Sequence, residues 1–236
     1  DGNHEKLASY SFQGEKILYT QKKLGVSPGY YYLKITEGSS LSDAKFQFRI
    51  NYNQVDNWER ELNNDYQTAN TIKVNTQYYG NSQKDYDQDW YKVQIPGNGS
   101  LSINFTRDYG VGGSLDIHLY NDQFEELEED YVGSGKAIFN SEKCGVTPGI
   151  YYLKIGDTWS EVEYSLKINF TASEMWEKEP NNDYSKATPI SMNAAYYGSL
   201  YKGTDADWYK IDIPAAGSYE LTFAHDYIQS DNTYWQ

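Results

Sequence analysis

The sequence predicts an all-β protein built from tandem β-sandwich domains of the jelly-roll type. Three observations predict this fold class. Apolar and polar residues alternate along several short segments, Gly and Pro turn signals separate these segments, and a pattern of about 119 residues repeats along the chain. Alternation with period two places one face of a strand in a core, and many short strands with such turns are typical of sandwiches and jelly rolls.

The alternating segments are the expected strands. Apolar residues alternate around Leu101, Ile103 and Phe105 within 100–109, and they occupy every second position in 151–155 and 163–170. The turn signals between the strands are Pro28-Gly29, Pro96-Gly97, Gly112-Gly113 and Pro148-Gly149. We expect one helical turn, at 181–187 (NNDYSKA), because Asn or Asp is there in a position to cap it.

Composition limits the classes of protein that the chain can represent. Of 236 residues, 39 % are hydrophobic and 25 are Tyr, which is enough to build cores. The net charge of −14 argues against binding nucleic acid or an anionic membrane and is compatible with binding cations. With Cys144 as the one cysteine, no internal disulfide forms, and we expect this residue to be a small core hydrophobe.

Targeting segments are not expected in this chain. No run of about 18 apolar residues occurs, so the sequence predicts no membrane-spanning helix and no membrane insertion. The first six residues, DGNHEK, lack the character of a signal peptide. We therefore expect the chain to be a piece of a longer protein.

The internal repeat is visible in three pairs of matching segments. These are KLGVSPGYYYLKI at 23–35 and KCGVTPGIYYLKI at 143–155, WERELNNDY at 58–66 and WEKEPNNDY at 176–184, and DQDWYKVQIP at 87–96 and DADWYKIDIP at 205–214. Three blocks at offsets of 118 to 120 residues indicate a repeated unit of ordinary domain length.

The repeat starts out of phase with the chain. Residues 57–173 form one complete copy, 174–236 match its first half, and 1–56 match its second half. A half-sandwich cannot bury its apolar face alone. We therefore expect the two half-repeats to complete a second sandwich, either within one chain or between neighbouring chains by exchange.

Each repeat opens with a segment rich in oxygen donors. Its leading members are Glu59, Glu61 and Asn63 in one copy and Glu177, Glu179 and Asn181 in the other. Pro180 excludes a regular helix, and in an extended chain residues two apart share a face. Two carboxylates on one face repel each other unless a cation lies between them. Calcium takes six to eight oxygens from carboxylates, amides and carbonyls.

A second acidic pair follows about 25 residues later, as Asp87 and Asp89 in one copy and Asp205 and Asp207 in the other. Each pair leads into an apolar strand, which is unusual unless the charges are neutralised. No His or Cys accompanies them, which argues against zinc and transition metals, and the spacing is not that of an EF-hand. The alternative is that Asn-Asn-Asp forms a turn or cap and the acids face water.

Four motifs in this order carry a resemblance to a known family. E-x-E-P-N-N-D-x-x-x-A, Y-G-S, D-x-D-W-Y and P-G-x-Y-Y-L-K-I resemble the landmarks of the bacterial pre-peptidase C-terminal (PPC) domain, which is related to the collagen-binding modules of clostridial collagenases. The resemblance covers essentially the whole chain. It implies a jelly-roll β-sandwich in a secreted or cell-surface bacterial protein, non-catalytic itself, and binding Ca²⁺ through the acidic linker at the start of the domain.

The resemblance also implies a ligand set in each copy. The expected metal ligands are Glu59, Glu61, Asn63, Asn64, Asn81, Asp87 and Asp89, and then Glu177, Glu179, Asn181, Asn182, Ser199 through its carbonyl, Asp205 and Asp207. The copies differ where Leu62 replaces Pro180 and where Asn81 replaces Ser199. Neither difference removes a carboxylate, so we expect both sites to be retained.

Collagen binding transfers poorly from the family. Collagen-binding members carry surface tyrosines just beyond the YYL strand, where this chain has 156–158 (GDT) and 36–38 (TEG). Those aromatic residues are absent, while another protein or a polysaccharide remains open as the ligand. The alternative function is accordingly a carbohydrate- or matrix-protein-binding adhesin module that uses exposed Tyr and Trp rings, such as one member of each Trp-Tyr pair in the DWYK strands.

An enzyme is the third interpretation, and we do not expect one. Asp205 with Asp207 could serve as acid and base, but carboxylates two apart without a donor network resemble metal ligands more closely. His4, His118 and His225 are scattered and none stands beside a candidate nucleophile. The stretch 132–137 (VGSGKA) lacks the glycine spacing of a phosphate-binding loop and is expected to be a hairpin loop.

Overall fold

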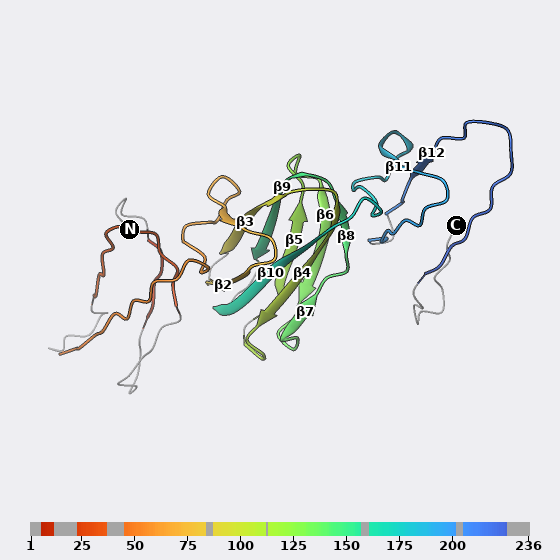
Figure 1. Ribbon diagram of the computed structural model, residues 1–236. Coiled ribbons are helices and arrows are strands. Elements are labelled where there is room, and N and C mark those ends of the chain that lie inside the picture. The colour runs from red at the N-terminus through yellow and green to blue at the C-terminus, as the bar shows by residue number, and fades with distance from the viewer. Residues whose placement is uncertain are drawn as a thin grey trace.

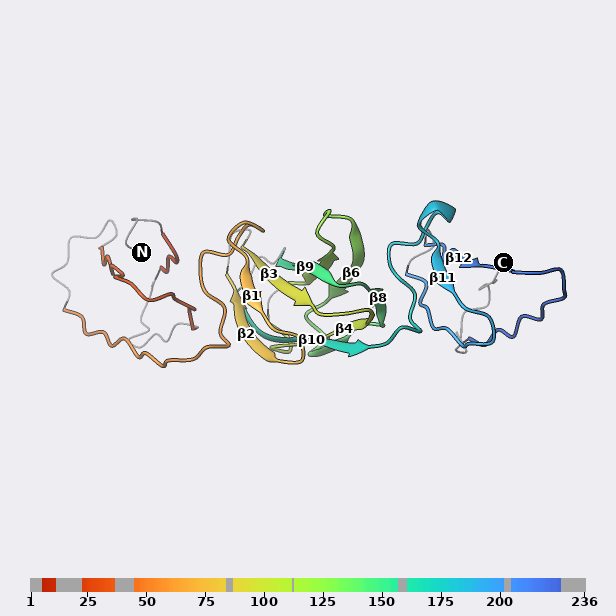
Figure 2. The same cartoon turned by 45° about the horizontal axis from the view of Figure 1, so that its top comes forward.

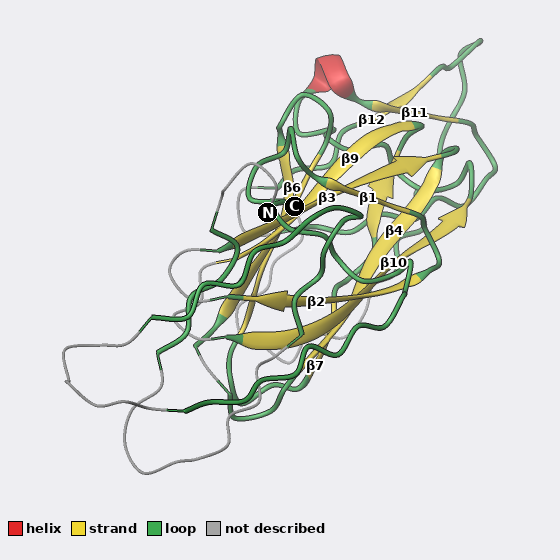
Figure 3. Ribbon diagram, turned by 90° about the vertical axis from the view of Figure 1, so that its left-hand side faces the viewer, coloured by secondary structure: helices red, strands yellow, loops and turns green. Residues whose placement is uncertain are grey.

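The structure is a computed structural model and describes residues 6–11, 23–36, 45–83, 87–111, 113–156, 161–201 and 205–225. The regular secondary structure of the described residues consists of strands, apart from a single 3₁₀ turn (Figure 3). Strands β1 to β10 form one sandwich in the middle of the chain, with the N-terminal segment on one side and the C-terminal segment on the other (Figure 1). The predicted all-β class and the predicted β-sandwich are confirmed.

The first sheet has the strand order β1-β3-β9-β5-β6 in the described part of the chain. Its strands are β1 (Asn70–Ile72), β3 (Gln88–Ile95), β9 (Gly149–Gly156), β5 (Leu115–Tyr120) and β6 (Glu126–Val132). β1 pairs with β3 in parallel, and the other neighbours in this sheet are antiparallel.

The second sheet has the order β2-β10-β4-β7, and β8 also pairs with β4. Its strands are β2 (Gln77–Ser82), β10 (Val162–Ala172), β4 (Gly99–Arg107), β7 (Ile138–Asn140) and β8 (Cys144–Val146). All of these pairings are antiparallel. The long strand β10 ends the second half of the repeat. It pairs with both β2 and β4, which come from the first half.

The core lies between the two sheets and follows the alternation of the sequence. In β3, Tyr91, Val93 and Ile95 are buried, while the residues between them face outward. The second sheet supplies inward side chains such as Phe105 and Leu166, which pair across β4 and β10. Burial of each large apolar side chain stabilises the fold by about 1.5–3 kcal/mol. Cys144 lies in this core, as expected.

The remaining elements belong to the C-terminal half-repeat. The 3₁₀ turn is Tyr184–Lys186, and the Asp183 side chain caps it by accepting a hydrogen bond from Ser185 N at 2.8 Å. Strand β11 (Thr188–Ile190) pairs in parallel with β12 (Tyr209–Ile211). The helical turn predicted at 181–187 is therefore confirmed.

The two terminal segments lie apart in a single chain. The N-terminal and C-terminal segments leave opposite ends of the sandwich in both views (Figures 1 and 2). In the described parts of 6–56 no strand forms, and in the described parts of 174–225 the pair β11–β12 is the one sheet. Completion of a second sandwich by these segments thus remains a prediction. No helix in the described residues is long and apolar enough to cross a membrane.

Candidate metal centres

Two clusters of carboxylates form where the repeats begin. Cluster A is Glu59, Glu61 and Asp89, and cluster B is Glu177, Glu179 and Asp207. Within each cluster, one oxygen of every side chain lies within 4.8 Å of the others. In both clusters the glutamates come from the linker that opens the repeat. The aspartate of cluster A lies at the start of β3, and the aspartate of cluster B lies just before β12.

Backbone hydrogen bonds hold this linker along two strands. In the central repeat, Trp90 N of β3 donates to the Asn63 carbonyl and Glu59 N donates to the Tyr79 carbonyl of β2, both at 2.9 Å. The C-terminal repeat has the same bonds, from Trp208 N to Asn181 at 3.1 Å and from Glu177 N to Tyr197 at 3.0 Å. An extended linker places alternate side chains on one face, which explains why the two glutamates of each linker point to the same aspartate.

Cluster A is buried, and its members repel one another. Burial, followed by repulsion from Glu61, raises the pKa of the Glu59 carboxyl to about 8. Burial, followed by repulsion from Asp87, raises the pKa of Glu61 to about 7. Burial and then Glu59 hold the pKa of Asp89 well above its usual range. Three carboxylates so close together are unfavourable as anions unless a proton or a cation neutralises them.

Two buried tyrosines orient cluster A. The Tyr164 hydroxyl of β10 donates to Asp89 Oδ2 at 2.6 Å and lies 2.9 Å from Glu59 Oε2. The Tyr91 hydroxyl donates to the same Glu59 oxygen at 3.1 Å and lies 2.7 Å from the hydroxyl of Tyr164. Asn81 N donates to the other oxygen of Glu59. The link between these tyrosines and the acids could not be predicted from sequence, because it requires both sheets to be in place.

The other residues expected as ligands surround cluster A. Asn63 is fully buried, and among the described residues neither atom of its amide group has a hydrogen-bond partner. Asp87 Oδ2 accepts a hydrogen bond from Gln83 N at 2.7 Å. The Asn64 amide, with its nitrogen turned toward Asp87, donates to Asp87 Oδ1 at 2.8 Å. Asp87 lies outside the group of three carboxylates that meet within 4.8 Å. Its charge is nevertheless close enough to contribute, after burial, to the raised pKa of Glu61.

Cluster B repeats this arrangement with more exposure. Glu177 is fully buried, and burial raises its pKa. Burial raises the pKa of half-buried Glu179 to about 7, and burial followed by Glu177 raises the pKa of Asp207 to about 8. The Ser199 N–H and hydroxyl both contact Glu177 Oε1, at 2.6 and 3.4 Å. The Tyr209 hydroxyl donates to Glu177 Oε2 at 2.9 Å, as Tyr91 does in cluster A.

The remaining residues of the second set have defined partners. Asn181 is fully buried, and its Nδ2 donates to Thr188 Oγ1 at 3.3 Å, while its Oδ1 has no hydrogen-bond partner in the part of the chain that the structure describes. Asn182 is exposed, and its Oδ1 accepts a backbone N–H at 3.0 Å. Asp205 Oδ2 accepts Tyr201 N at 2.5 Å and lies outside the 4.8 Å group. The structure thus brings the second acidic pair of each repeat to the linker, with one aspartate in the cluster and one beside it.

Buried oxygens without hydrogen-bond partners mark both clusters. In the described residues they are Glu61 Oε2, Asn63 Oδ1, Asn81 Oδ1 and Asp89 Oδ1 near cluster A, and Glu179 Oε1, Asn181 Oδ1 and Asp207 Oδ1 near cluster B. Buried polar atoms in folded proteins are nearly always hydrogen-bonded. A shared set of unpartnered carboxylate and amide oxygens fits the ligands that a hard divalent cation prefers.

Glycine at two equivalent positions makes room for the clusters. A Cβ on Gly80 would lie 2.6 Å from Glu59 Oε2 and 2.5 Å from the Tyr164 hydroxyl. A Cβ on Gly198 would lie 2.4 Å from Glu177 Oε2 and 2.5 Å from the hydroxyl of its tyrosine partner. Gly198 is the glycine of the Y-G-S motif, and Gly80 is its equivalent in the central repeat. The structure gives the reason for glycine at both positions, since the carboxylate packs directly against the backbone there.

The chain is similar in sequence to collagenases of two Clostridium species. No family model matches the chain. Collagenase ColA of Clostridium perfringens (strain 13 / Type A) is 31 % identical over 173 residues, which is 66 % of this chain and 15 % of that protein. Collagenase ColT of Clostridium tetani (strain Massachusetts / E88) is 28 % identical over 156 residues, 60 % of this chain and 15 % of that protein. The chain therefore spans a small part of the curated relatives that it matches.

Solved structures of similar shape include the pre-peptidase C-terminal domain of a collagenase from Bacillus anthracis. That match has 22 % identity and a TM-score of 0.35, and covers 43 % of this chain and 94 % of that domain. A carbohydrate-binding module of Cellvibrio mixtus lichenase 5A matches with 16 % identity and a TM-score of 0.29, over 39 % of this chain and 78 % of that one. The resemblance carried by the four sequence motifs is confirmed by the clostridial collagenases, to which this chain is similar in sequence.

Proposed function

We propose that clusters A and B each bind one calcium ion, and that the chain is a non-catalytic accessory module of a secreted or cell-surface bacterial protein. One observation carries the metal proposal. The same three carboxylates converge within 4.8 Å in both repeats, beside buried oxygens that have no hydrogen-bond partner. The similarity to collagenases, of which this chain spans a small part, supports an accessory role beside another unit.

Calcium fits these ligands better than other biological cations do. The candidate ligands are carboxylate and amide oxygens, which hard cations prefer over the nitrogen and sulfur ligands of zinc. The set is large and irregular, with Glu59, Asn63 and Asp89 buried and Asn64 at the surface. Magnesium requires near-octahedral geometry and keeps several waters, whereas calcium accepts six to eight oxygens in flexible arrangements.

The metal would stabilise the start of each repeat. It would offset the burial and the repulsion that together raise the pKa values of Glu59 and Glu61 above their ordinary range. It would also fasten the linker to β3, because Asp89 comes from that strand and the glutamates come from the linker. A cation that binds the folded state alone stabilises that state by mass action.

Calcium titration of the purified chain tests this proposal. At a calcium concentration of about 100 times Kd, each occupied site should stabilise the folded state by roughly 2.7 kcal/mol, and one site alone should raise the Tm by roughly 5–10 °C relative to chelator. Isothermal titration should show two sites. Terbium in place of calcium should luminesce on excitation of the protein, because Tyr91 and Tyr164 contact cluster A and Tyr209 contacts cluster B.

Single substitutions assign each site to its cluster. Glu59→Gln should abolish one site and Glu177→Gln the other, because each removes the carboxylate that the tyrosines hold in place. Asp212→Asn is the matched control, since it also removes one negative charge and its side chain is exposed outside both clusters. Unchanged melting and no binding of calcium or terbium by the native chain would rule the proposal out.

A second candidate function rests on a patch of rings on the outer side of the first sheet. This aromatic face consists of Tyr66, Trp90, Tyr120, Phe124 and Tyr152. Trp90 stacks on Tyr120 with ring centroids 5.8 Å apart, and Phe124 stacks on Tyr152 at 5.2 Å. Contiguous, partly exposed rings suit a sugar ring or an extended peptide, and this arrangement favours the adhesin alternative as an additional role.

Binding of soluble probes distinguishes this role from simple packing. Cellohexaose and gelatin would be titrated against the native chain and against a Tyr120→Ala, Tyr152→Ala variant, with isothermal titration calorimetry as readout. Loss of saturable binding in the variant, with binding retained in Tyr131→Ala, supports the aromatic face, because Tyr131 is 68 % exposed on the edge strand β6 and outside the face. Equal signals from all three proteins would show that the rings only pack against one another.

A further inference from the structure

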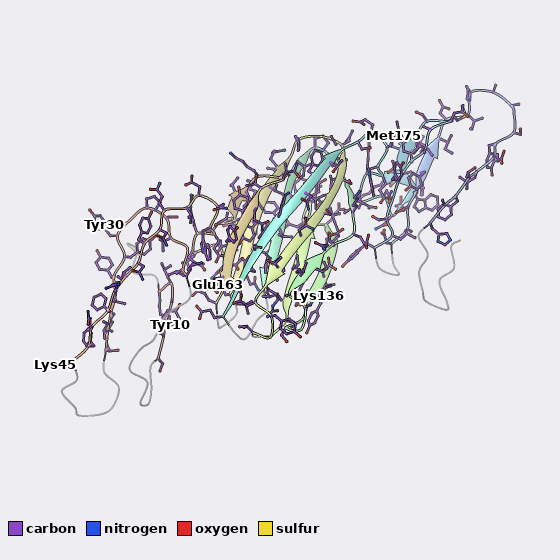
Figure 4. The ribbon with its side chains drawn as sticks, turned by 60° about the horizontal axis from the view of Figure 1, so that its bottom comes forward. Tyr10, Tyr30, Lys45, Lys136, Glu163 and Met175 are labelled. Atoms are coloured by element: carbon purple, nitrogen blue, oxygen red, sulfur yellow. The ribbon has the colours of Figure 1, made fainter. Side chains whose placement is uncertain are left out.

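A cleft lies between the central repeat and the repeat that follows it. The linker to this next repeat leaves the central sandwich at Met175, shortly after the end of β10 (Figure 4). The cleft, called the joint cleft below, has a volume of about 400 Å³. Residues of both repeats line it, among them Gln123, Glu125, Thr147 and Ile150 of the central repeat and Pro180 and Lys186 of the next.

Two elements of the central repeat connect the aromatic face to the joint cleft. Phe124 belongs to the face, and its two neighbours in the chain, Gln123 and Glu125, line the cleft. On β9, Tyr152 belongs to the face and Ile150 lines the cleft. Residues two apart on a strand point to the same side of a sheet. The rings and the cleft therefore form one continuous surface.

The loop between β5 and β6 holds Phe124 in an unfavourable backbone conformation. Its φ is +58°, in the left-handed region that bulky residues rarely adopt. Asn121 imposes this conformation, because its carbonyl accepts a hydrogen bond from Phe124 N at 3.1 Å. Asn121 Oδ1 also accepts from Gln123 N and Glu125 N, at 3.0 and 2.9 Å. The Phe124 ring is nevertheless 42 % exposed. Such strain is concentrated at sites that hold ligands.

A lysine of the next repeat forms the opposite wall of the joint cleft. Lys186 Nζ lies 2.7 Å from Glu125 Oε1, and Glu125 Oε2 accepts a hydrogen bond from Asn121 Nδ2 at 2.8 Å. The 3₁₀ turn positions Lys186, whose N–H donates to the Asp183 carbonyl at 2.8 Å. The cleft thus has a fixed wall in each repeat, and a ligand inside it contacts both.

The charges around the rings favour a neutral ligand. Glu125 is paired with Lys186, and Glu126 Oε1 lies 2.6 Å from His118 Nδ1. The two carboxylates that follow Phe124 in the chain therefore already have partners, and a cationic ligand would gain little from them. The net charge of −14 repels an anionic polymer.

The position of the rings favours a sugar chain over a peptide. The aromatic face lies over β3, β9 and β5, whose backbone groups pair with one another inside the sheet. A peptide that binds by strand addition needs the free backbone of an edge strand. Sugar rings instead stack on aromatic rings through their flat apolar sides. Their hydroxyl groups can exchange hydrogen bonds with amides and hydroxyls, such as those of Gln123 and Thr147 in the cleft.

We propose that the aromatic face and the joint cleft form one extended site for a neutral polysaccharide, in which Phe124 joins the two parts. This inference rests on the aromatic face proposed above as a ligand-binding surface. It adds the cleft, the contribution of a second repeat and the class of ligand, and it does not depend on metal binding. A chain of several sugar rings fills the whole site, whereas a short one reaches the aromatic face alone.

Electrophoresis of the full chain through native gels that contain a polysaccharide tests the class of ligand. At least one of the neutral polymers hydroxyethylcellulose, glucomannan and arabinoxylan should retard the chain, and the anionic polymer alginate should not. Equal retardation by alginate would overturn the proposal. No retardation in any gel would overturn it together with the aromatic face as a polysaccharide site. Binding of gelatin without retardation by any polysaccharide would overturn it and leave the aromatic face as a protein-binding surface.

Oligosaccharides of two lengths test the joint cleft by isothermal titration. Gln123→Ala combined with Lys186→Ala should weaken the binding of a hexasaccharide of the retarding polymer roughly tenfold and leave the affinity for a trisaccharide unchanged. The matched control is Gln77→Ala with Lys167→Ala, which removes the same two side-chain types from the outer side of the second sheet and should bind like the native chain. Full hexasaccharide affinity in the cleft variant would overturn the extension into the cleft, while the aromatic face would stand. An equal loss for both lengths would overturn it as well.

Phe124→Asn separates ligand binding from packing. Asn adopts the left-handed conformation more readily than Phe, so the urea midpoint of this variant should be at least that of the native chain. Its affinity for the hexasaccharide should fall roughly tenfold, because the ring between face and cleft is lost. Phe124→Tyr keeps the ring and should bind like the native chain. A lower midpoint with native affinity would show that the ring only packs against Tyr152, and would overturn its proposed role.

Discussion

At the scale of single residues, the clusters depend on the space left by glycine as much as on the carboxylates. Glu59 Oε2 lies where only a residue without a Cβ fits, at Gly80. The hydroxyl of Tyr164 occupies the other side of the same space. The acids are thus buried because the backbone of β2 lets them approach, and this close approach aligns their oxygens with those of Asp89.

Gly80→Ala should therefore disrupt cluster A. The added methyl group would lie 2.5–2.6 Å from Tyr164 and Glu59, so one of these buried groups must move. Overpacking of this kind costs about 1–3 kcal/mol of the free energy of unfolding. We expect a lower denaturation midpoint and the loss of one calcium site, measured by urea unfolding and by titration. Gly97→Ala, where a Cβ has no neighbour within 4 Å, should change neither.

Glu128 provides a prediction about pH that is independent of the clusters. Its side chain is buried on β6, and burial followed by repulsion from Asp130 raises its pKa to about 8. A carboxyl whose pKa is higher in the folded state stabilises the fold at low pH. That contribution is complete below the unfolded pKa, near 4.5, and is lost as the pH rises to about 8.

Glu128→Gln should consequently be more stable than the native chain at pH 8.5 and differ little from it at pH 4. The measurement is the urea midpoint of both proteins at the two pH values, in the presence of chelator. Glu220→Gln removes a carboxylate at an exposed position outside the central sandwich and should follow the native chain at both. If Glu128→Gln destabilised the fold equally at the two pH values, the effect of the substitution would come from packing alone. The prediction of a buried charge at Glu128 would then be wrong.

At the scale of elements, the joint between repeats is built the same way twice. A Cβ on Gly145, in β8, would lie 2.3 Å from the Glu177 carbonyl, and a Cβ on Gly25 would lie 1.7 Å from the Glu59 carbonyl. Lys143 lies over the Trp176 ring at 5.7 Å, and Lys23 lies over the Trp58 ring at 4.9 Å. Each acidic linker thus packs on the strand, or on the equivalent segment, of the repeat before it.

Gly145→Ala should loosen this joint without unfolding the central sandwich. The methyl group must displace the linker at Glu177, and Lys178, whose N–H donates to Thr188 Oγ1 at 2.9 Å, should become accessible. We expect trypsin to cleave after Lys178 several times faster than in the native chain, as followed by mass spectrometry. Gly135→Ala, with no neighbour near its Cβ, is the control and should leave the cleavage rate unchanged.

At the scale of the whole molecule, much of the sandwich follows from local pattern. The alternation in 100–109, 151–155 and 163–170 predicts β4, β9 and β10, because period two is a property of the strand itself. The order of strands in the sheets could not be predicted in this way. β5 pairs with β9 and β4 with β10, at separations that no local pattern encodes.

The carboxylate clusters could likewise be predicted from the sequence only in part. Repetition of the acidic pairs predicted that linker and hairpin carboxylates would meet, and the structure brings Glu59, Glu61 and Asp89 together. It also shows that Asp87 stands just outside that group. Which of two aspartates two residues apart turns inward depends on the packing of Tyr164 from the other sheet, and that contact spans 75 residues of sequence.

The sequence by itself determined the class of fold, the length of the repeat and the residues from which an oxygen-rich site is built, because strand period, turn chemistry and donor type are properties of neighbouring residues. Tertiary structure alone decided which carboxylates meet, which tyrosines hold them and which glycines give them room. It also decided that the two half-repeats of one chain lie at opposite ends of the sandwich (Figures 1 and 2). These outcomes depend on contacts between distant strands, and such contacts exist only after the sheets have packed against each other.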